Sequence, residues 1–168
     1  MRALGRLFDI NTGFAPVDTQ TGANTGLRVR MNKAQGCTFV YYKAAGTGTD
    51  VSVLTLQEHN ASTGGTSQNL AKITAVHKKT ATVLDGSETW TLTTQAAAAT
   101  YTNTGDATKQ GIYVIHIDGA SLSDGFTHLS MSVADTGSAG TQPGAMLYFL
   151  TDLEVQRKPE SLANLLNG

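Results

Sequence analysis

The stretch VSVLTLQEHNASTGGTSQNLAKI, residues 51–73, governs the interpretation of the whole chain. Its first half alternates with a period of two, which is the spacing that a β-strand imposes on its two faces. Val51 and Val53 fall on one face, and Leu54 and Leu56 fall on the other. The loop that follows, residues 59–68, is longer than a tight hairpin needs. The stretch therefore predicts the central hairpin of an all-β domain whose sheet is partly buried on both sides, as in a sandwich or at a subunit contact.

The composition also favours strands and turns over helices. Charged residues make up 15% of the 168 residues and glycine occurs 18 times, whereas soluble domains are usually about 25% charged. The length fits one domain that buries a core without disulfides or metal. The formal net charge is −1, so neither nucleic acid nor a membrane is expected as a partner.

Other segments add to the strand count. Seven further runs are alternating or continuously apolar: residues 27–31, 37–43, 70–76, 88–95, Gln110–Asp118, 126–135 and 144–153. Eight or nine strands at short spacing predict a single β-sandwich or jelly roll. The run Gln110–Asp118 is apolar on both faces and is expected to be an interior strand.

Some single residues carry expectations of their own. Trp90 and Leu92 share a face and are expected in the core, with an exposed aromatic platform for sugar as the alternative. The alanine run 96–99 is expected to be irregular. Cys37, the single cysteine, lies in the apolar run CTFVYY and is expected to be buried and inert.

The chain divides into an extended N-terminal arm (residues 1–26), a sandwich domain (27–158) and a short tail (159–168). Residues 1–10 lack the apolar core of a signal peptide, and no stretch approaches the ~20 apolar residues of a membrane span. The chain is therefore expected to be soluble, without a secretion signal.

Both ends combine apolar residues with segments too short to bury them, so we expect one or both to contact a partner; folding back on the same sandwich is the alternative. Two arginines on one face of the 27–31 strand are a further candidate contact, with an acidic protein surface or with solvent. The predicted capsid or subunit contact residues are Leu4, Leu7, Phe8, Ile10, Arg28, Arg30, Leu162, Leu165 and Leu166.

Catalytic and metal-binding patterns are weak. His116 and His128 would meet only if their strands pair, and lone strand histidines are more often solvated or hydrogen-bonded. Glu58 and Glu88 are the candidates for paired carboxylates, but nothing in the sequence brings them together. No nucleophile elbow or phosphate loop occurs. We therefore predict no enzyme, no cofactor and no metal site.

Four segments carry a resemblance: LTLQEHNASTGGTSQNLAKI, GSETWT, QGIYVIHIDGASLSDGFTHLSMSVADTG and GAMLYFLTDL. They resemble small β-rich head proteins of tailed bacteriophages, the decoration (cement) or minor capsid proteins. The resemblance implies a virion structural protein on the capsid exterior, assembled in the host cytoplasm. It also implies the major capsid protein as partner, a homo-oligomer, often a trimer, and no cofactor. The alternative is a carbohydrate-binding or tail-fibre module that uses exposed aromatic side chains, with Tyr41, Tyr42, Tyr101 and Trp90 as candidates.

Overall fold

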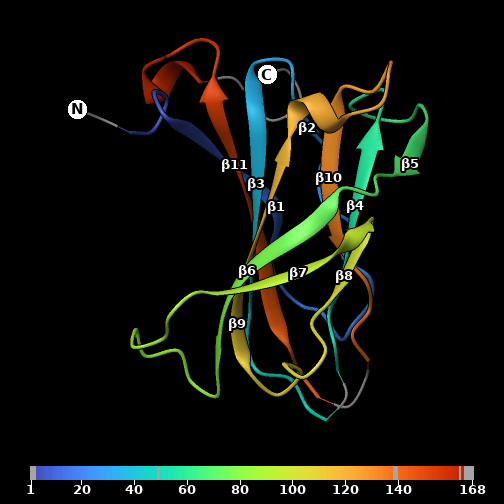
Figure 1. Cartoon of the computed structure of the whole chain (residues 1–168), viewed down its shortest axis with the longest axis vertical. Coiled ribbons are helices and arrows are strands. Elements are labelled where there is room, and N and C mark those ends of the chain that lie inside the picture. Colours follow the sequence, from blue (N-terminus) through green and yellow to red (C-terminus); the bar gives the residue numbers. More distant parts are fainter. Residues whose placement is uncertain (1–2, 49, 138–139, 163, 165–168) are drawn as a thin grey trace.

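A computed structural model describes residues 3–48, 50–137, 140–162 and 164. Over these residues the chain is almost entirely β-structure, in two antiparallel sheets packed face to face, and the predicted all-β sandwich is confirmed (Figure 1). The strands are β1 (Phe8–Asp18), β2 (Val29–Arg30), β3 (Ala34–Lys43), β4 (Val53–His59), β5 (Ser67–Asn69), β6 (Ile73–Ala81), β7 (Thr91–Ala98), β8 (Thr100–Thr102), β9 (Gln110–Asp118), β10 (His128–Val133) and β11 (Pro143–Leu153). Two 3-10 turns, η1 (Gly119–Ser121) and η2 (Pro159–Ser161), complete the described elements.

The two sheets differ in size. The larger sheet has six strands in the order β1-β11-β3-β9-β6-β7, and the smaller has β2-β10-β4-β5 with β8 also paired to β4. The described residues form eleven strands, against the eight or nine predicted, and the unpredicted ones include β1 and the short β8. The predicted strand at 27–31 is reduced to the two residues of β2. β9 lies between β3 and β6, so the predicted interior strand is confirmed.

The core lies between the sheets because β3, β4, β9, β10 and β11 alternate apolar residues inward. Phe39 on β3 and Tyr148 on β11 are buried with their ring centroids 4.8 Å apart. The Tyr148 hydroxyl accepts a hydrogen bond from the Met131 N–H at 2.9 Å and donates to the Met131 carbonyl at 3.2 Å, which ties the two sheets together. Cys37 is fully buried as predicted, and burial raises the pKa of its thiol.

The central hairpin is present, with β4 and β5 paired from Gln57 opposite Asn69 to His59 opposite Ser67. Its loop is closed by a hydrogen bond from the Thr66 N–H to the Asn60 side-chain oxygen at 2.8 Å. The second strand of the hairpin has only three residues. The chain then crosses to the six-stranded sheet as β6.

The prediction of an extended N-terminal arm is wrong for residues 8–18. Residues 8–18, expected to extend outside the domain, form the edge strand β1, paired with β11 from Phe8 opposite Thr151 to Asp18 opposite Pro143. Backbone hydrogen bonds to an existing strand need few apolar side chains, so a polar segment can still join a sheet. Residues 96–98 likewise continue strand β7 instead of being irregular, because β6 supplies a pairing partner. In the described part of the chain, no helix is long and apolar enough to cross a membrane.

Candidate functional site

The two ends of the described chain lie against each other at one end of the sandwich (Figure 1). The Arg157 N–H donates a hydrogen bond to the Gly5 carbonyl at 2.8 Å. Gly5 has a φ of +80°, and a Cβ there would lie 2.4 Å from the Arg157 carbonyl oxygen, so this contact requires glycine. We call the exposed residues around it the terminal patch: Leu4, Arg6, Leu7, Gln156, Arg157, Lys158 and Glu160. Leu4, Arg6 and the segment 156–160 line a shallow hollow there.

The predicted contact residues of the two ends have different environments. Leu7 is 62% exposed, and Leu4 and Ile10 are exposed as well. Phe8 is half-buried, with its ring centroid 5.8 Å from that of Phe149. Leu162 is half-buried and lines a second hollow with residues of the β11 end. The ends therefore fold back on their own sandwich, yet several of their leucines remain in solvent.

Leu165 and Leu166 lie outside the described residues. The described part of the tail forms the short 3-10 turn η2.

The two arginines predicted as contacts are both half-buried. The guanidinium of Arg28 donates to the carbonyls of Ala61 at 2.8 Å and Gly64 at 2.7 Å and to the Ser67 hydroxyl at 3.1 Å. Arg28 therefore holds the loop of the central hairpin. Arg30 lines the second hollow, and its Nε atom is buried with no hydrogen-bond partner among the described residues.

The outer face of the six-stranded sheet is apolar and open. One row of side chains runs across it through directly paired residues: Leu147 opposite Val40, Val40 opposite Val114, and then His77 between Val114 and Leu92. The row on one side runs through Ala145, Tyr42 and Ile112 to Lys79, and the row on the other side runs through Ile10, Phe149 and Thr38 to His116. We call this surface the bare face, and its apolar members are Ile10, Val40, Tyr42, Leu92, Ile112, Val114, Leu147 and Phe149.

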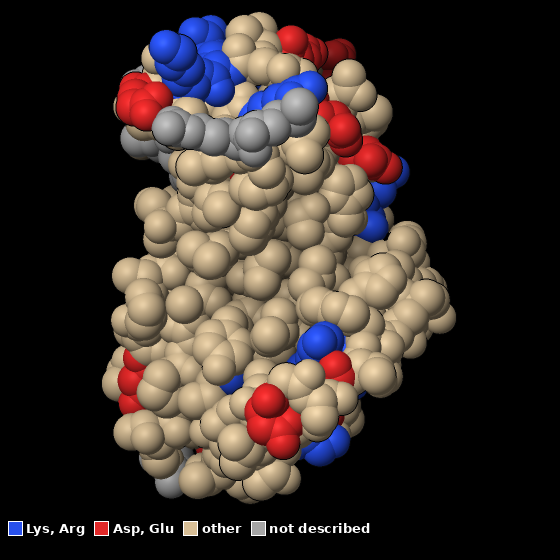
Figure 2. Space-filling view, turned by 90° about the vertical axis from the view of Figure 1, so that its left-hand side faces the viewer, with Lys and Arg blue, Asp and Glu red and all other residues tan. Residues whose placement is uncertain are grey.

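Exposure on the bare face is high for apolar side chains. Tyr42 is 51% exposed, Leu92 57% and Leu147 41%. Single exposed leucines are ordinary, but a contiguous apolar patch marks a contact surface. Figure 2, which looks onto the side of the molecule occupied by the six-stranded sheet in Figure 1, shows Lys, Arg, Asp and Glu gathered towards the two ends with a broad uncharged band between them.

Trp90 and Leu92 share this outward side, so their predicted place in the core is wrong. Trp90 is 51% exposed, and the Lys79 ammonium lies 5.2 Å from its ring centroid. Alternation correctly put the two residues on one face, but it does not tell which face is inside. The exposed indole is the alternative that the sequence had left open.

The outer face of the five-stranded sheet is polar. His59 is buried there between two serines, with Nδ1 2.7 Å from the Ser67 hydroxyl and Nε2 2.8 Å from the Ser130 hydroxyl. Burial, with the nearby charges of Arg28 and His128, lowers the pKa of His59 to about 4. His59 is therefore neutral at pH 7 and acts as a structural hydrogen-bonding group.

The other titratable candidates remain apart. His116 lies on β9 beside Thr38 and Asp118, while His128 pairs with His59 in the other sheet, so these two histidines do not meet. Among the described residues, no three His, Cys, Asp or Glu side chains are grouped for a metal ion.

The two glutamates hold separate loops. Glu58 accepts hydrogen bonds from the backbone and hydroxyl of Ser123 and from Gln68. Burial alone would raise the pKa of Glu58, but these hydrogen bonds outweigh it and hold the pKa below its usual range. Glu88 accepts from the backbone N–H groups of Asp85 and Gly86 in the exposed β6–β7 loop. The paired carboxylates that a glycosidase needs are not formed by these two residues.

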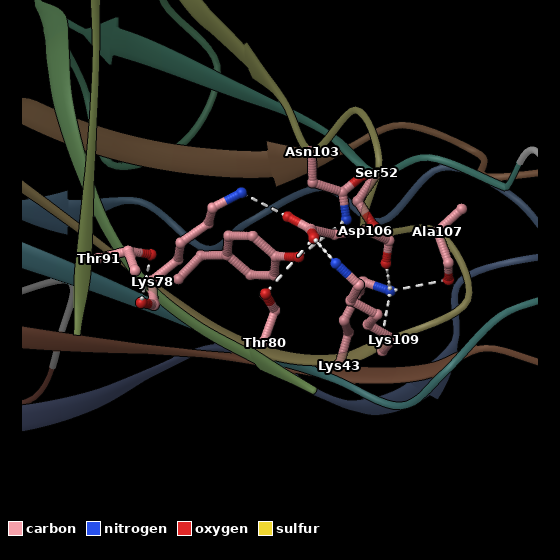
Figure 3. A network of polar contacts seen from close by, with 10 residues as sticks. Lys43, Ser52, Lys78, Thr80, Thr91, Asn103, Asp106, Ala107 and Lys109 are labelled. Carbon is pink, nitrogen blue, oxygen red and sulfur yellow. Dashed lines mark hydrogen bonds and ion pairs between the residues drawn. The ribbon is translucent and has the colours of Figure 1, made fainter. Parts of the chain in front are cut away.

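A buried polar network that the sequence analysis missed lies at one end of the core (Figure 3). Lys43 is fully buried and donates to the carbonyls of Asp106 at 3.0 Å, Ala107 at 3.1 Å and Lys109 at 2.7 Å. Burial lowers the pKa of Lys43 to about 8, with Asp106 opposing the shift. Every described partner is a backbone carbonyl and the ammonium has no exposed surface, so Lys43 secures the 106–109 loop rather than offering a nucleophile.

Asp106 is the anionic centre of this network. It pairs with Lys78 at 2.5 Å and with Lys109 at 3.0 Å. Burial alone would raise its pKa, but the hydrogen bonds from the two lysines outweigh burial and hold the pKa of Asp106 below its usual range. The only hint in the sequence was the lysine at position 43, which falls on the inward side of an apolar strand.

Comparison of the chain with protein-family models, with curated proteins and with solved structures found no match.

Proposed function

We propose that this protein is a structural protein of a phage virion, a decoration (cement) protein that binds the major capsid protein on the outer capsid surface and stabilises the shell as a homo-oligomer, in line with the resemblance to trimeric proteins. The observation that carries the proposal is the terminal patch. Two chain ends that the sequence marked as contacts lie side by side and leave Leu4 and Leu7 in solvent beside three cations.

The composition of the terminal patch suits attachment to a protein lattice. Covering exposed apolar surface contributes about 25 cal/mol per Å². The three positive charges of Arg6, Arg157 and Lys158 outnumber the negative charge of Glu160, so the terminal patch favours an acidic partner surface and steers the encounter. A small contact of this kind is weak by itself, but subunits joined in an oligomer engage a repeating shell at several points and gain avidity. A sandwich tied together by inward hydrogen bonds is a rigid carrier for such a patch.

The test measures occupancy on particles stripped of the native protein. Leu7→Asp should reduce binding strongly, since a charge replaces an apolar contact, and removal of the first ten residues should do the same. Val83→Asp is the matched control, because Val83 is 63% exposed against 62% for Leu7 and lies in the β6–β7 loop. Full occupancy by folded Leu7→Asp protein would reject the terminal patch as the attachment site.

A carbohydrate-binding module is the second candidate, and the exposed ring of Trp90 is the observation that favours it. Sugar faces stack on such rings. Tyr42 is a further exposed aromatic, next to a hollow lined by Pro16, Gln110 and Pro143. Binding to a glycan array that Trp90→Ala abolishes would support this candidate over capsid attachment. Tyr41 and Tyr101 are buried and are unsuited to the role.

A further inference from the structure

We propose that the bare face is covered by a second copy of this chain. The inference rests on the proposed function only for the idea of self-association, and the surface is identified from its own geometry. The central row is built from Leu147, Val40, Val114 and Leu92, with His77 between the last two. These side chains project from strands whose opposite faces form the core, and Leu92 and Leu147 remain 57% and 41% exposed in the subunit.

Charge is the reason to expect a copy of the same chain. When two copies meet through the same surface, residue i of one copy contacts residue j of the other, so a surface that carries charges of one sign repels its copy and an uncharged apolar surface does not. The central row of the bare face has no Lys, Arg, Asp or Glu, and Lys79 in the row beside it lies against the Trp90 ring. Figure 2 shows charged side chains concentrated towards the ends of this side. The opposite outer face carries Arg28 and Arg30 and would repel a copy of itself.

The size of the bare face is compatible with a specific contact of modest strength. Six strands about 4.8 Å apart and three rows of outward side chains cover roughly 500 Å². A standard interface buries about 800 Å² on each partner, so the bare face supplies the centre of such a contact. Two such sheets would stack about 10 Å apart, as in a sandwich core. We therefore expect reversible association that is strongest where the local concentration is high.

Sedimentation equilibrium of the full chain tests the proposal. The wild type should show concentration-dependent association, and Leu147→Glu should weaken it at least tenfold by placing like charges in the contact. Leu27→Glu is the matched control, since Leu27 is 53% exposed and precedes β2 outside the bare face. Circular dichroism and a thermal melt establish that each variant is folded. A Val40→Cys variant with a thiol-specific cross-linker gives a second readout, because the natural cysteine is buried.

The outcomes separate this inference from the proposed attachment. Weaker association of Leu147→Glu and cross-linking through position 40 support a second copy. A wild type that stays monomeric at high concentration, or an oligomer that Leu147→Glu leaves unchanged, overturns it. If the wild type is monomeric and Leu147→Glu reduces capsid occupancy, the bare face binds the capsid partner. That result also overturns the proposal of a second copy. Leu7→Asp should reduce occupancy without changing the association measured in solution, so failure of one proposal is distinguishable from failure of the other.

Discussion

The two outer faces of the sandwich arise from the same strand alternation, but one is polar and the other is apolar. On the five-stranded sheet, the outward residues include Thr55, Gln57 and His59, and Arg28 draws the hairpin loop against that side through three hydrogen bonds. On the six-stranded sheet, the outward residues include Val40 and Leu147, with no loop described over them. A polar outer face that can stay hydrated gains little free energy when a partner covers it. An apolar outer face left open gains free energy when a partner covers it.

The largest expected effect is a loss of folding stability at low pH, caused by protonation of a histidine on the polar face. The pKa of His59 is about 4 in the folded chain, below its ordinary value of 6.5, so the unfolded chain takes up the proton first. The stability that neutral His59 contributes is complete above pH 6.5 and is lost as pH falls from 6.5 towards 4. The loss should reach roughly 2 to 3 kcal/mol, since each pKa unit corresponds to about 1.4 kcal/mol.

Urea unfolding at pH 7, 6, 5 and 4 measures this loss. Near His59, Arg28 and His128 add to the effect and Glu58 opposes it. The stability that neutral His128 contributes is also lost as pH falls, because burial lowers the pKa of His128 too. His59→Gln should flatten most of the profile between pH 6.5 and 4. An identical profile in wild type and His59→Gln would show that the polar face is not held by this histidine.

Arg28→Ala should cost about 1 to 2 kcal/mol, because it removes three hydrogen bonds from a charged donor at a partly exposed site. Backbone amides of residues 60–67 should lose protection in hydrogen exchange, while amides of the six-stranded sheet keep theirs. Arg28→Lys, with a single compact ammonium, should restore part of the stability. Unchanged protection of the loop in Arg28→Ala would contradict the role assigned to Arg28.

Gly5→Ala tests whether the terminal patch and the bare face act separately. The added Cβ would clash with the Arg157 carbonyl, so the ends should separate and capsid occupancy should fall, with about 1 kcal/mol lost from stability. Gly125→Ala is the matched control, since it has the same φ of +80° and open space around the Cβ. Association in solution should be unchanged in both variants. A large change in association with Gly5→Ala would mean that the two surfaces form one site.

The smallest effect on stability is expected when one outward residue of each face takes the residue type of the other. Val40→Thr and Thr55→Val should each change the free energy of unfolding by less than about 0.5 kcal/mol, because both side chains are only half-buried. Val40→Thr should nevertheless weaken association measurably, whereas Thr55→Val should not. A loss of more than 2 kcal/mol in Val40→Thr would show that Val40 is packed within the subunit, against the description of an open face.

Local patterns predicted much of the fold and less of the surfaces. The central hairpin, the interior strand Gln110–Asp118 and the buried Cys37 were predictable, because each depends on neighbours in sequence. The pairing of β1 with β11 was not, since it joins residues more than a hundred positions apart through the backbone. The separation of His116 from His128 likewise depended on which strands pair.

By itself, the sequence determined the all-β class, the approximate strand positions and which side chains share a face, because a period of two follows from the geometry of an extended chain. Tertiary structure alone decided which face became the core. Trp90 and Leu92 sit on an apolar side that points outward, whereas the charged Lys43 points inward to three carbonyls. Strand alternation is symmetric between the two sides of a sheet, and only the packing of the second sheet breaks that symmetry.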